Sequence, residues 1–232
     1  MFIEQYNDEG LAHLSYVVGD ESQACVIDSR IDIDVYLEAA HQHSVSITHI
    51  FETHRNEDYV IGSQNLAERT GAKIYHGAHL DFGYGNAARD GDCFTFGSVQ
   101  LNVLETPGHT PESLSFVLYD TSTGEAPLSV FTGDALFVGT AGRSNLWKTR
   151  EEAAGILYDS IHEKLLLLGD HVIIYPAHGA GSVCGSDLAA RNFSTIGYEK
   201  KYNIVLQCDS RHRFINQQKD KDFDHPPYFK EM

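Results

Sequence analysis

Four side chains that can bind a metal ion each follow a short apolar segment of the sequence. They are His54 in IFETHRNEDY, His109 in LETPGHTPES, Asp134 in SVFTGDALF and His178 in VIIYPAHGAG. Imidazole nitrogens and carboxylate oxygens are common ligands of zinc and iron. A single histidine in such a place is more often a hydrogen-bonded structural residue than a ligand. Because strand ends on one edge of a sandwich converge, the fourfold recurrence predicts one shared metal centre.

The segments between these motifs predict the elements that hold them. In the first half, strand-like runs such as QACVIDSR and SITHIFET alternate with helical spacing, as in DVYLEAAHQH. From residue 93 onward, CFTFG, VQLNVLET and LSFVLYD predict antiparallel strands, and residues 149–170 predict a long amphipathic helix. Two similar halves favour two packed sheets over one doubly wound sheet. We therefore predict an α/β fold, an αββα sandwich of two mixed β-sheets with helices on the outer faces.

The composition is that of a globular chain with an acidic surface. Hydrophobic residues make up 42% of the 232 residues, and 17 basic against 33 acidic residues give a formal net charge of −16. This charge argues against nucleic acid and membrane partners. The four cysteines are widely spaced, no apolar run could cross a membrane, and the first residues do not resemble a secretory signal. We expect reduced thiols and a cytoplasmic location.

The chain is predicted to form one catalytic domain over residues 1–210. A single α/β sandwich of this size can bury one continuous core. The remaining residues, 211–232, include QQKDKDFDHPPYFKEM, which becomes charged and then carries two prolines. This change of composition indicates a C-terminal extension or linker.

The order of the motifs resembles the metallo-β-lactamase fold from about residue 2 to residue 205. The first motif of that family is H-x-H-x-D-H, and its four places are held here by His54, Asn56, Asp58 and Tyr59. VGTAGRSNL resembles a G-R-x-D segment of glyoxalase II-like members, with Asn145 in place of the acid. ETHRNEDYVIGS, ETPGHTPES, VFTGDALFVG and PAHGAGSVCG resemble the persulfide dioxygenase branch, in particular members with a rhodanese domain attached.

The resemblance implies a mononuclear non-haem iron enzyme. Members of the branch bind one Fe(II) through two histidines and one aspartate, which would be His54, His109 and Asp134 here. The implied reaction oxidises a low-molecular-weight thiol persulfide, of the glutathione or coenzyme A type, with O2 to sulfite and thiol. Zinc in an isolated sample would fit the same ligands. Asn56 and Tyr59 remove mainly what a second metal ion would need, so one ion is expected.

Four further residues are predicted to support catalysis, each with a structural alternative. Asp58 and His178 would orient a ligand or a bound water, although Asp58 would equally well cap the following helix. Arg143 would pair with a carboxylate or phosphate of the thiol carrier, or be a solvated surface residue. Cys184, in the glycine-rich GAGSVCG, would accept a sulfane sulfur, or be a small buried residue.

Two other functions and two protein partners stay open. A glyoxalase II-like thioester hydrolase would use a hydroxide held between two metal ions. A catalytically silent binding module would explain the changes at Asn56, Tyr59 and Asn145. The resemblance implies a rhodanese domain in the same or a partner chain, and a homodimer is the other assembly that we consider.

Overall fold

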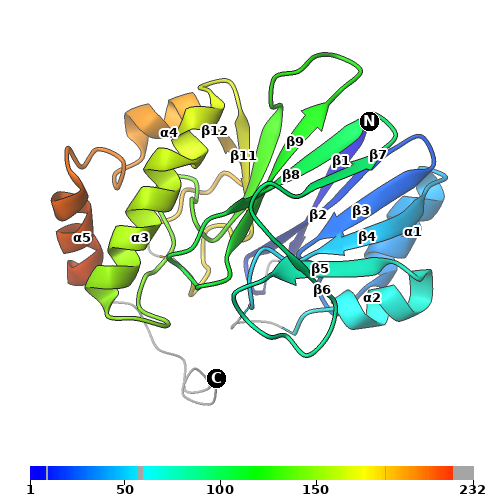
Figure 1. The fold of residues 1–232 in the computed structure, drawn as a ribbon, viewed down its shortest axis with the longest axis horizontal. Helices are drawn as coiled ribbons and strands as arrows, with labels where there is room; N and C mark the ends of the chain where they lie inside the picture. The colour runs from blue at the N-terminus through cyan, green and yellow to red at the C-terminus, as the bar shows by residue number, and fades with distance from the viewer. Residues whose placement is uncertain (9, 57–59, 186, 222–232) are drawn as a thin grey trace.

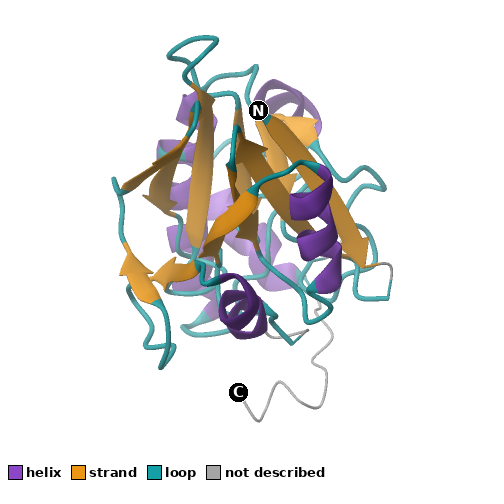
Figure 2. Cartoon of the chain, turned by 90° about the vertical axis from the view of Figure 1, so that its right-hand side faces the viewer, coloured by secondary structure: helices purple, strands orange, loops and turns teal. Residues whose placement is uncertain are grey.

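Two six-stranded β-sheets pack face to face, and helices cover their outer faces (Figure 1). The structure is a computed structural model that describes residues 1–8, 10–56, 60–185 and 187–221. Each sheet contains both parallel and antiparallel strand pairs. The view turned by 90° also places helices outside the strand layers (Figure 2). The predicted αββα sandwich of two mixed sheets is therefore confirmed.

The N-terminal half forms the first sheet and the two helices beside it. Its strands, in spatial order, are β1 (Phe2–Asp8), β2 (His13–Asp20), β3 (Gln23–Ile27), β4 (Ser46–Phe51), β5 (Lys73–Gly77) and β6 (Asn86–Ala88). Helices α1 (Asp34–Gln42) and α2 (Ser63–Thr70) connect the parallel strands of this sheet. Tyr36 and Leu66 of these helices pack in one apolar cluster with Ile50 of β4. This packing positions the end of β4.

The C-terminal half forms the second sheet. Its strands, in spatial order, are β12 (Ser194–Thr195), β11 (Ile173–Pro176), β10 (Ser129–Gly133), β9 (Leu114–Asp120), β8 (Val99–Glu105) and β7 (Cys93–Phe96). Its helices are α3 (Arg150–Glu163), the short 3-10 helix η1 (Leu165–Leu168), α4 (Ile196–Tyr202) and α5 (Arg211–Asp220). Helix α5 takes up the start of the predicted extension, and its Phe214 is buried in the same cluster as Leu157 of α3. Among the described residues, no helix is long and apolar enough to cross a membrane.

The long helix predicted over residues 149–170 is divided in two. Thr149 begins α3 with a capping box, in which Thr149 and Glu152 each accept a hydrogen bond from the other's backbone. Lys164 then leaves the helical conformation, with φ −122° and ψ −64°, so α3 ends at Glu163. The tighter turn of η1 follows and buries Leu165 and Leu166.

Large apolar side chains fill the space between the sheets. Phe51 and Phe116 face each other from opposite sheets, with ring centroids 4.9 Å apart, and Tyr16 packs on Phe131 at 5.0 Å. These residues belong to one buried cluster. Aromatic contacts of this kind hold the sheets at a fixed separation.

The strands deliver the predicted site residues to one edge of this sandwich. The loops after β4, β8, β10 and β11 carry His54, His109, Asp134 and His178, respectively. Two backbone hydrogen bonds of 2.7 Å join the sheets at this edge, one from Leu114 N to Thr53 O and one from Leu14 N to Ala177 O. Residues from both sheets therefore meet there in a fixed register.

Candidate metal centre

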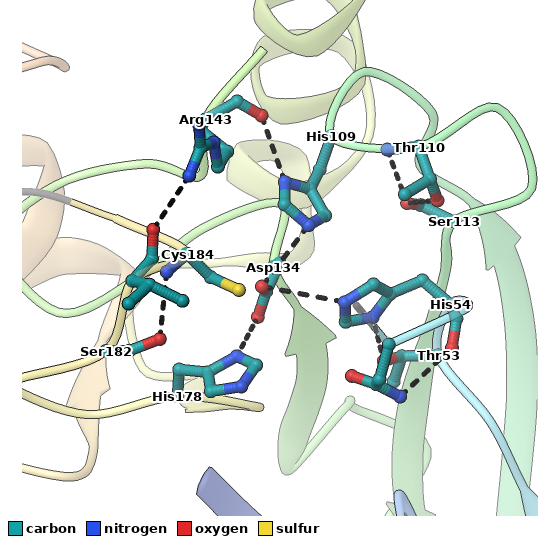
Figure 3. A network of polar contacts seen from close by, with 12 residues as sticks. Thr53, His54, His109, Thr110, Ser113, Asp134, Arg143, His178, Ser182 and Cys184 are labelled. Carbon is teal, nitrogen blue, oxygen red and sulfur yellow. Dashed lines mark hydrogen bonds and ion pairs between the residues drawn. The ribbon is translucent and has the colours of Figure 1, made fainter. Parts of the chain in front are cut away.

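His54, His109 and Asp134 converge in the interior of the protein (Figure 3). Asp134 Oδ2 lies 3.5 Å from His54 Nε2 and 3.4 Å from His109 Nε2. These contacts are longer than an ordinary N–H···O hydrogen bond. Three ligands about 2.1 Å from one ion in a tetrahedral arrangement are about 3.4 Å apart. Since His109 Nε2 and Asp134 Oδ2 form no hydrogen bond with the described part of the chain, these residues fit a shared metal ion.

The side chains behind His54 determine which of its nitrogens faces Asp134. Thr53 Oγ1 donates a hydrogen bond of 2.9 Å to Asp28 Oδ2, and Thr53 N donates to Asp28 Oδ1 at 2.8 Å. The Thr53 oxygen is then free to accept from His54 Nδ1, which lies 2.9 Å away. Nε2 of His54 therefore carries the lone pair toward the centre, as a ligand requires. Burial raises the pKa of Asp28 to about 6.

His109 is oriented in the same way by a backbone carbonyl. Its Nδ1 donates to the carbonyl oxygen of Arg143 at 2.9 Å, which leaves the lone pair on Nε2. Burial lowers the pKa of His109 to about 4, although the nearby Asp134 carboxylate opposes this shift. The imidazole is therefore neutral and able to bind a metal ion over the physiological pH range.

This low pKa predicts that His109 makes the metal-free protein less stable in acid. Between the ordinary pKa of 6.5 and the folded value of about 4, the unfolded chain binds a proton at His109 that the folded chain does not. The free energy of unfolding should therefore fall by about 3 kcal/mol from this residue as the pH drops through that window. Asp28 acts in the opposite direction, because its raised pKa favours the folded state at low pH.

Urea unfolding of metal-free protein at pH 7 and pH 4 isolates the contribution of His109. The decrease between the two pH values should be about 3 kcal/mol smaller in His109→Gln than in the wild type. Equal decreases in the two proteins would contradict the prediction.

The two carboxylate oxygens of Asp134 face different histidines. Nδ1 of His178 donates to Asp134 Oδ1 at 2.8 Å, so Oδ2 faces His54 and His109 (Figure 3). Although burial would raise the pKa of Asp134, the His178 and His54 imidazoles hold this pKa well below its usual range. The structure thus brings His178 to the candidate ligand Asp134, and its role in orienting that carboxylate stays a prediction.

Glu112 joins the loop that carries His54 to the loop that carries His109. Its Oε1 accepts a hydrogen bond of 2.8 Å from Arg55 N, and its side chain is buried. The backbone bond from Leu114 N to Thr53 O runs beside it. Glu112 was not predicted from the sequence, because its partner lies 57 residues away.

Glu112→Ala is therefore expected to weaken metal binding by about 10 to 100-fold, since the two histidine loops lose one of their links. Glu112→Gln keeps an oxygen acceptor for Arg55 N and should stay within a few-fold of the wild type. Competition with a chromophoric chelator measures both affinities, with Glu125→Ala in an exposed turn as the control. If the alanine and glutamine variants bind equally well, Glu112 does not position the centre.

Arg143 lies inside the protein, with no exposed side-chain area. Its Nε donates to Asn145 Oδ1 at 2.8 Å and its Nη1 to Val183 O at 3.0 Å. Asn145, which replaces the acid of related segments, therefore accepts a hydrogen bond from the Arg143 side chain. The interpretation of Arg143 as a solvated surface residue is wrong, whereas its binding of a substrate anion stays a prediction.

Cys184 lies at the opposite side of Asp134 from His54 (Figure 3). Its side chain is 1% exposed, and ligand atoms of Asp134, His178 and Cys184 all lie within 4.8 Å of one another. The structure thus brings Cys184 to the predicted centre. Its role as a sulfur acceptor stays a prediction.

The changed first motif is described only in part. Asp58 and Tyr59 lie outside the described residues, so the two roles predicted for Asp58 stay predictions. Asn56 donates from Nδ2 to the carbonyl oxygen of His54 at 3.1 Å. Its amide nitrogen is therefore engaged by backbone.

Besides Glu112, two further residues near the centre were not predicted from the sequence. Asp28 follows the apolar run QACVI, the same strand-end signal that marked the four motifs, and could have been found by it. His13 begins β2 and is fully buried, with its ring 5.7 Å from that of His178. No local signal marks His13, because a long-range β-bridge to His178 places it there.

Comparison with known proteins places this geometry in a known family. Residues 8–178 match the model of the metallo-beta-lactamase superfamily. Persulfide dioxygenase ETHE1, mitochondrial, from Mus musculus is 30% identical over 210 residues, which cover 84% of this chain and 72% of that protein. A probable polyketide biosynthesis zinc-dependent hydrolase, BaeB from Bacillus velezensis, is 28% identical over 214 residues, which cover 87% and 84%.

Two crystal structures share the whole fold. A metallo-beta-lactamase from Staphylococcus aureus superposes with a TM-score of 0.92 at 34% identity, covering 99% of this chain and 70% of that one. ETHE1 from Myxococcus xanthus superposes with a TM-score of 0.85 at 31% identity, covering 99% and 95%. The likeness thus extends from the motifs to the full arrangement of both sheets.

Proposed function

The chain belongs to the metallo-β-lactamase superfamily, and from this premise we propose that it is a persulfide dioxygenase dependent on one Fe(II) ion. The observation that carries the proposal is the ligand set itself. His54, His109 and Asp134 offer two imidazoles and one carboxylate at ligand spacing, which is the set typical of non-haem Fe(II) oxygenases. The similarity to ETHE1 proteins supports the same activity.

The proposed overall reaction converts RSSH, O2 and water into RSH and sulfurous acid, which ionises to sulfite. Both atoms of O2 pass to the terminal sulfur, water supplies the third oxygen, and the sulfur–sulfur bond breaks to release the thiol. Bound Fe(II) would supply the redox chemistry between persulfide and O2.

The protein's own residues would orient the ligands and exclude bulk water. Thr53 and the Arg143 carbonyl keep Nε2 of each histidine directed at the ion position. His178 holds the Asp134 carboxylate. Burial of all three ligands keeps competing water away from the centre.

Oxygen consumption by anaerobically purified, iron-loaded protein tests this function. With glutathione persulfide or coenzyme A persulfide, we expect one O2 consumed for each sulfite released, and no consumption by the zinc-loaded protein. Absence of O2 uptake by fully iron-loaded protein with both substrates would overturn the proposal.

A thioester hydrolase is the second candidate, and the cluster of Asp134, His178 and Cys184 is the observation that favours it. This cluster offers ligand atoms for a second ion beside the first. Two ions per chain and hydrolysis of a glutathione thioester would support this function, whereas a single iron would not.

Cys184 is expected to take up sulfane sulfur from the substrate. Its thiolate would attack the terminal sulfur of RSSH, forming the Cys184 persulfide and releasing RSH. Mass spectrometry should then detect one added sulfur in the wild type and none in Cys184→Ser, with the exposed Cys93→Ser as the control. Unchanged sulfur uptake, turnover and product ratio in Cys184→Ser would contradict this role.

The rhodanese partner, the homodimer and the cytoplasmic location stay predictions.

A further inference from the structure

A pocket of about 220 Å³ adjoins the candidate metal centre, and the described residues that line it all come from the first half of the chain. One wall follows β4 and includes Glu52, His54 and Asn56. The segment between β5 and β6 also lines the pocket and contributes Phe82 and Tyr84. His54 is the residue that this pocket shares with the ligand set. A ligand bound there would therefore lie beside the ion position.

Asn56 contributes a hydrogen-bond acceptor to this pocket. Because Asn56 Nδ2 donates to the His54 carbonyl, the amide oxygen Oδ1 is the remaining polar atom of that side chain. This oxygen is buried and has no hydrogen-bond partner in the described part of the chain. An unpaired buried acceptor costs about 1–3 kcal/mol, a cost that a donor on a ligand would remove.

Two carboxyl groups line the same pocket, and burial raises the pKa of the inner one, Glu52, to about 7, so Asp81 is the main source of negative charge. Glu52 is buried and accepts hydrogen bonds of 3.1 Å from the Tyr84 hydroxyl at both oxygens. Within the described ranges it has no ion-pair partner. Asp81 lies at the rim, where its Oδ1 accepts from Gly83 N at 2.9 Å. Among the described residues that line the pocket, the acids are Glu52 and Asp81, and Arg55 is the one permanently cationic residue.

Aromatic rings from the segment between β5 and β6 also line the pocket. Phe82 and Tyr84 meet edge to face, with centroids 5.9 Å apart, and the His76 ring stacks on Phe82 at 4.1 Å. Ile61 and Leu80 supply aliphatic contacts. Aromatic faces combined with carboxylates favour an organic ammonium group, by cation–π attraction and charge-assisted hydrogen bonds.

We propose that this pocket binds the protonated amino group of a small ligand. Resting on the proposed function, this ligand is the substrate itself, so the preferred persulfide is that of an aminothiol. Asn56 would then accept a hydrogen bond from the substrate, although its position in the first motif is that of a metal ligand in relatives of the family.

Titration with three small probes that lack a thiol tests the pocket without the sulfur group of the substrate, which would bind the metal ion. Propylammonium, 1-propanol and propionate would be added to zinc-loaded protein while the NMR signals of the Ile61 and Leu80 methyl groups are followed. We expect propylammonium to bind at least about 10-fold more tightly than 1-propanol, the equivalent of one good hydrogen bond. Equal binding of 1-propanol, or tighter binding of propionate, would overturn the proposal.

Substitutions test whether Asn56 and Asp81 cause the preference for propylammonium. Asn56→Leu and Asp81→Asn should each reduce the preference for propylammonium several-fold, while Asn65→Leu on the exposed face of α2 should leave it unchanged. Should Asn56→Leu fail to fold, the wild-type series and Asp81→Asn still decide the question. If Asp81→Asn keeps the same preference for propylammonium as the wild type and the Asn65→Leu control, the ammonium group binds elsewhere.

Kinetics on iron-loaded protein separate this proposal from the proposed function. The kcat/KM for cysteamine persulfide should exceed that for propane persulfide, and Asp81→Asn should remove the difference. Dioxygenase activity without this difference would overturn the aminothiol preference alone. Selective binding of propylammonium by a protein that consumes no O2 would instead overturn the proposed function.

Discussion

Asp134→Asn is expected to reduce the affinity for a divalent metal ion at least about 100-fold while the protein stays folded. Structural zinc sites with four ligands bind with about 10–16 kcal/mol, so one ligand is worth about 3 kcal/mol. Asparagine has nearly the same shape, and its amide oxygen can still accept from His178 Nδ1. Its NH2 group would then face His54 Nε2 and His109 Nε2 in place of Oδ2.

Because of this orientation, the substitution should weaken metal binding more than removal of the negative charge alone would. The two imidazole lone pairs would accept hydrogen bonds from the amide, which occupies the position that an ion needs. Affinity is measured by chelator competition with Fe(II) and Zn(II), and folding by circular dichroism and thermal unfolding. Asp170→Asn, exposed between η1 and β11, is the matched control. Retention of wild-type affinity in Asp134→Asn would exclude the assigned ligand set.

Arg143→Met is expected to lower the free energy of unfolding by about 3–5 kcal/mol. The guanidinium is fully buried, and its loss leaves Asn145 Oδ1 and Val183 O without their donors, at about 1–3 kcal/mol each. Methionine fills much of the volume but donates no hydrogen bond. For a chain of this length the melting temperature should fall by about 10 °C.

The same substitution should also disturb the metal centre, because two neighbouring segments depend on Arg143. Its carbonyl orients His109, and its side chain holds the residue before Cys184. We therefore expect weaker metal binding in Arg143→Met, and a smaller stability loss in Arg143→Lys, which keeps the charge. Arg191→Met, with half of its side chain exposed, should cost less than about 1 kcal/mol. A stability change of that small size in Arg143→Met would mean that the buried guanidinium is not structurally required.

The positions of the candidate metal-binding residues relative to the strands could be predicted from the sequence alone. Apolar runs with the period of a strand, each followed by a histidine or aspartate, are local features, and strand ends must meet at a sheet edge. His54, His109, Asp134 and His178 were found in this way, together with the two-sheet architecture. The early end of α3 at Glu163 was missed, because backbone conformation at Lys164 overrides the propensity of the leucine run.

The contacts that hold these residues, and the atoms that each turns toward the centre, could be seen only in the folded structure. The choice of Nε2 in both histidines depends on hydrogen bonds to Thr53 and to the Arg143 carbonyl, and the latter spans 34 residues. The burial of Arg143 and the link from Glu112 to Arg55 likewise arise from packing between segments far apart in the chain. Such contacts have no local period or spacing to mark them, because each is set by the packing of two sheets against each other.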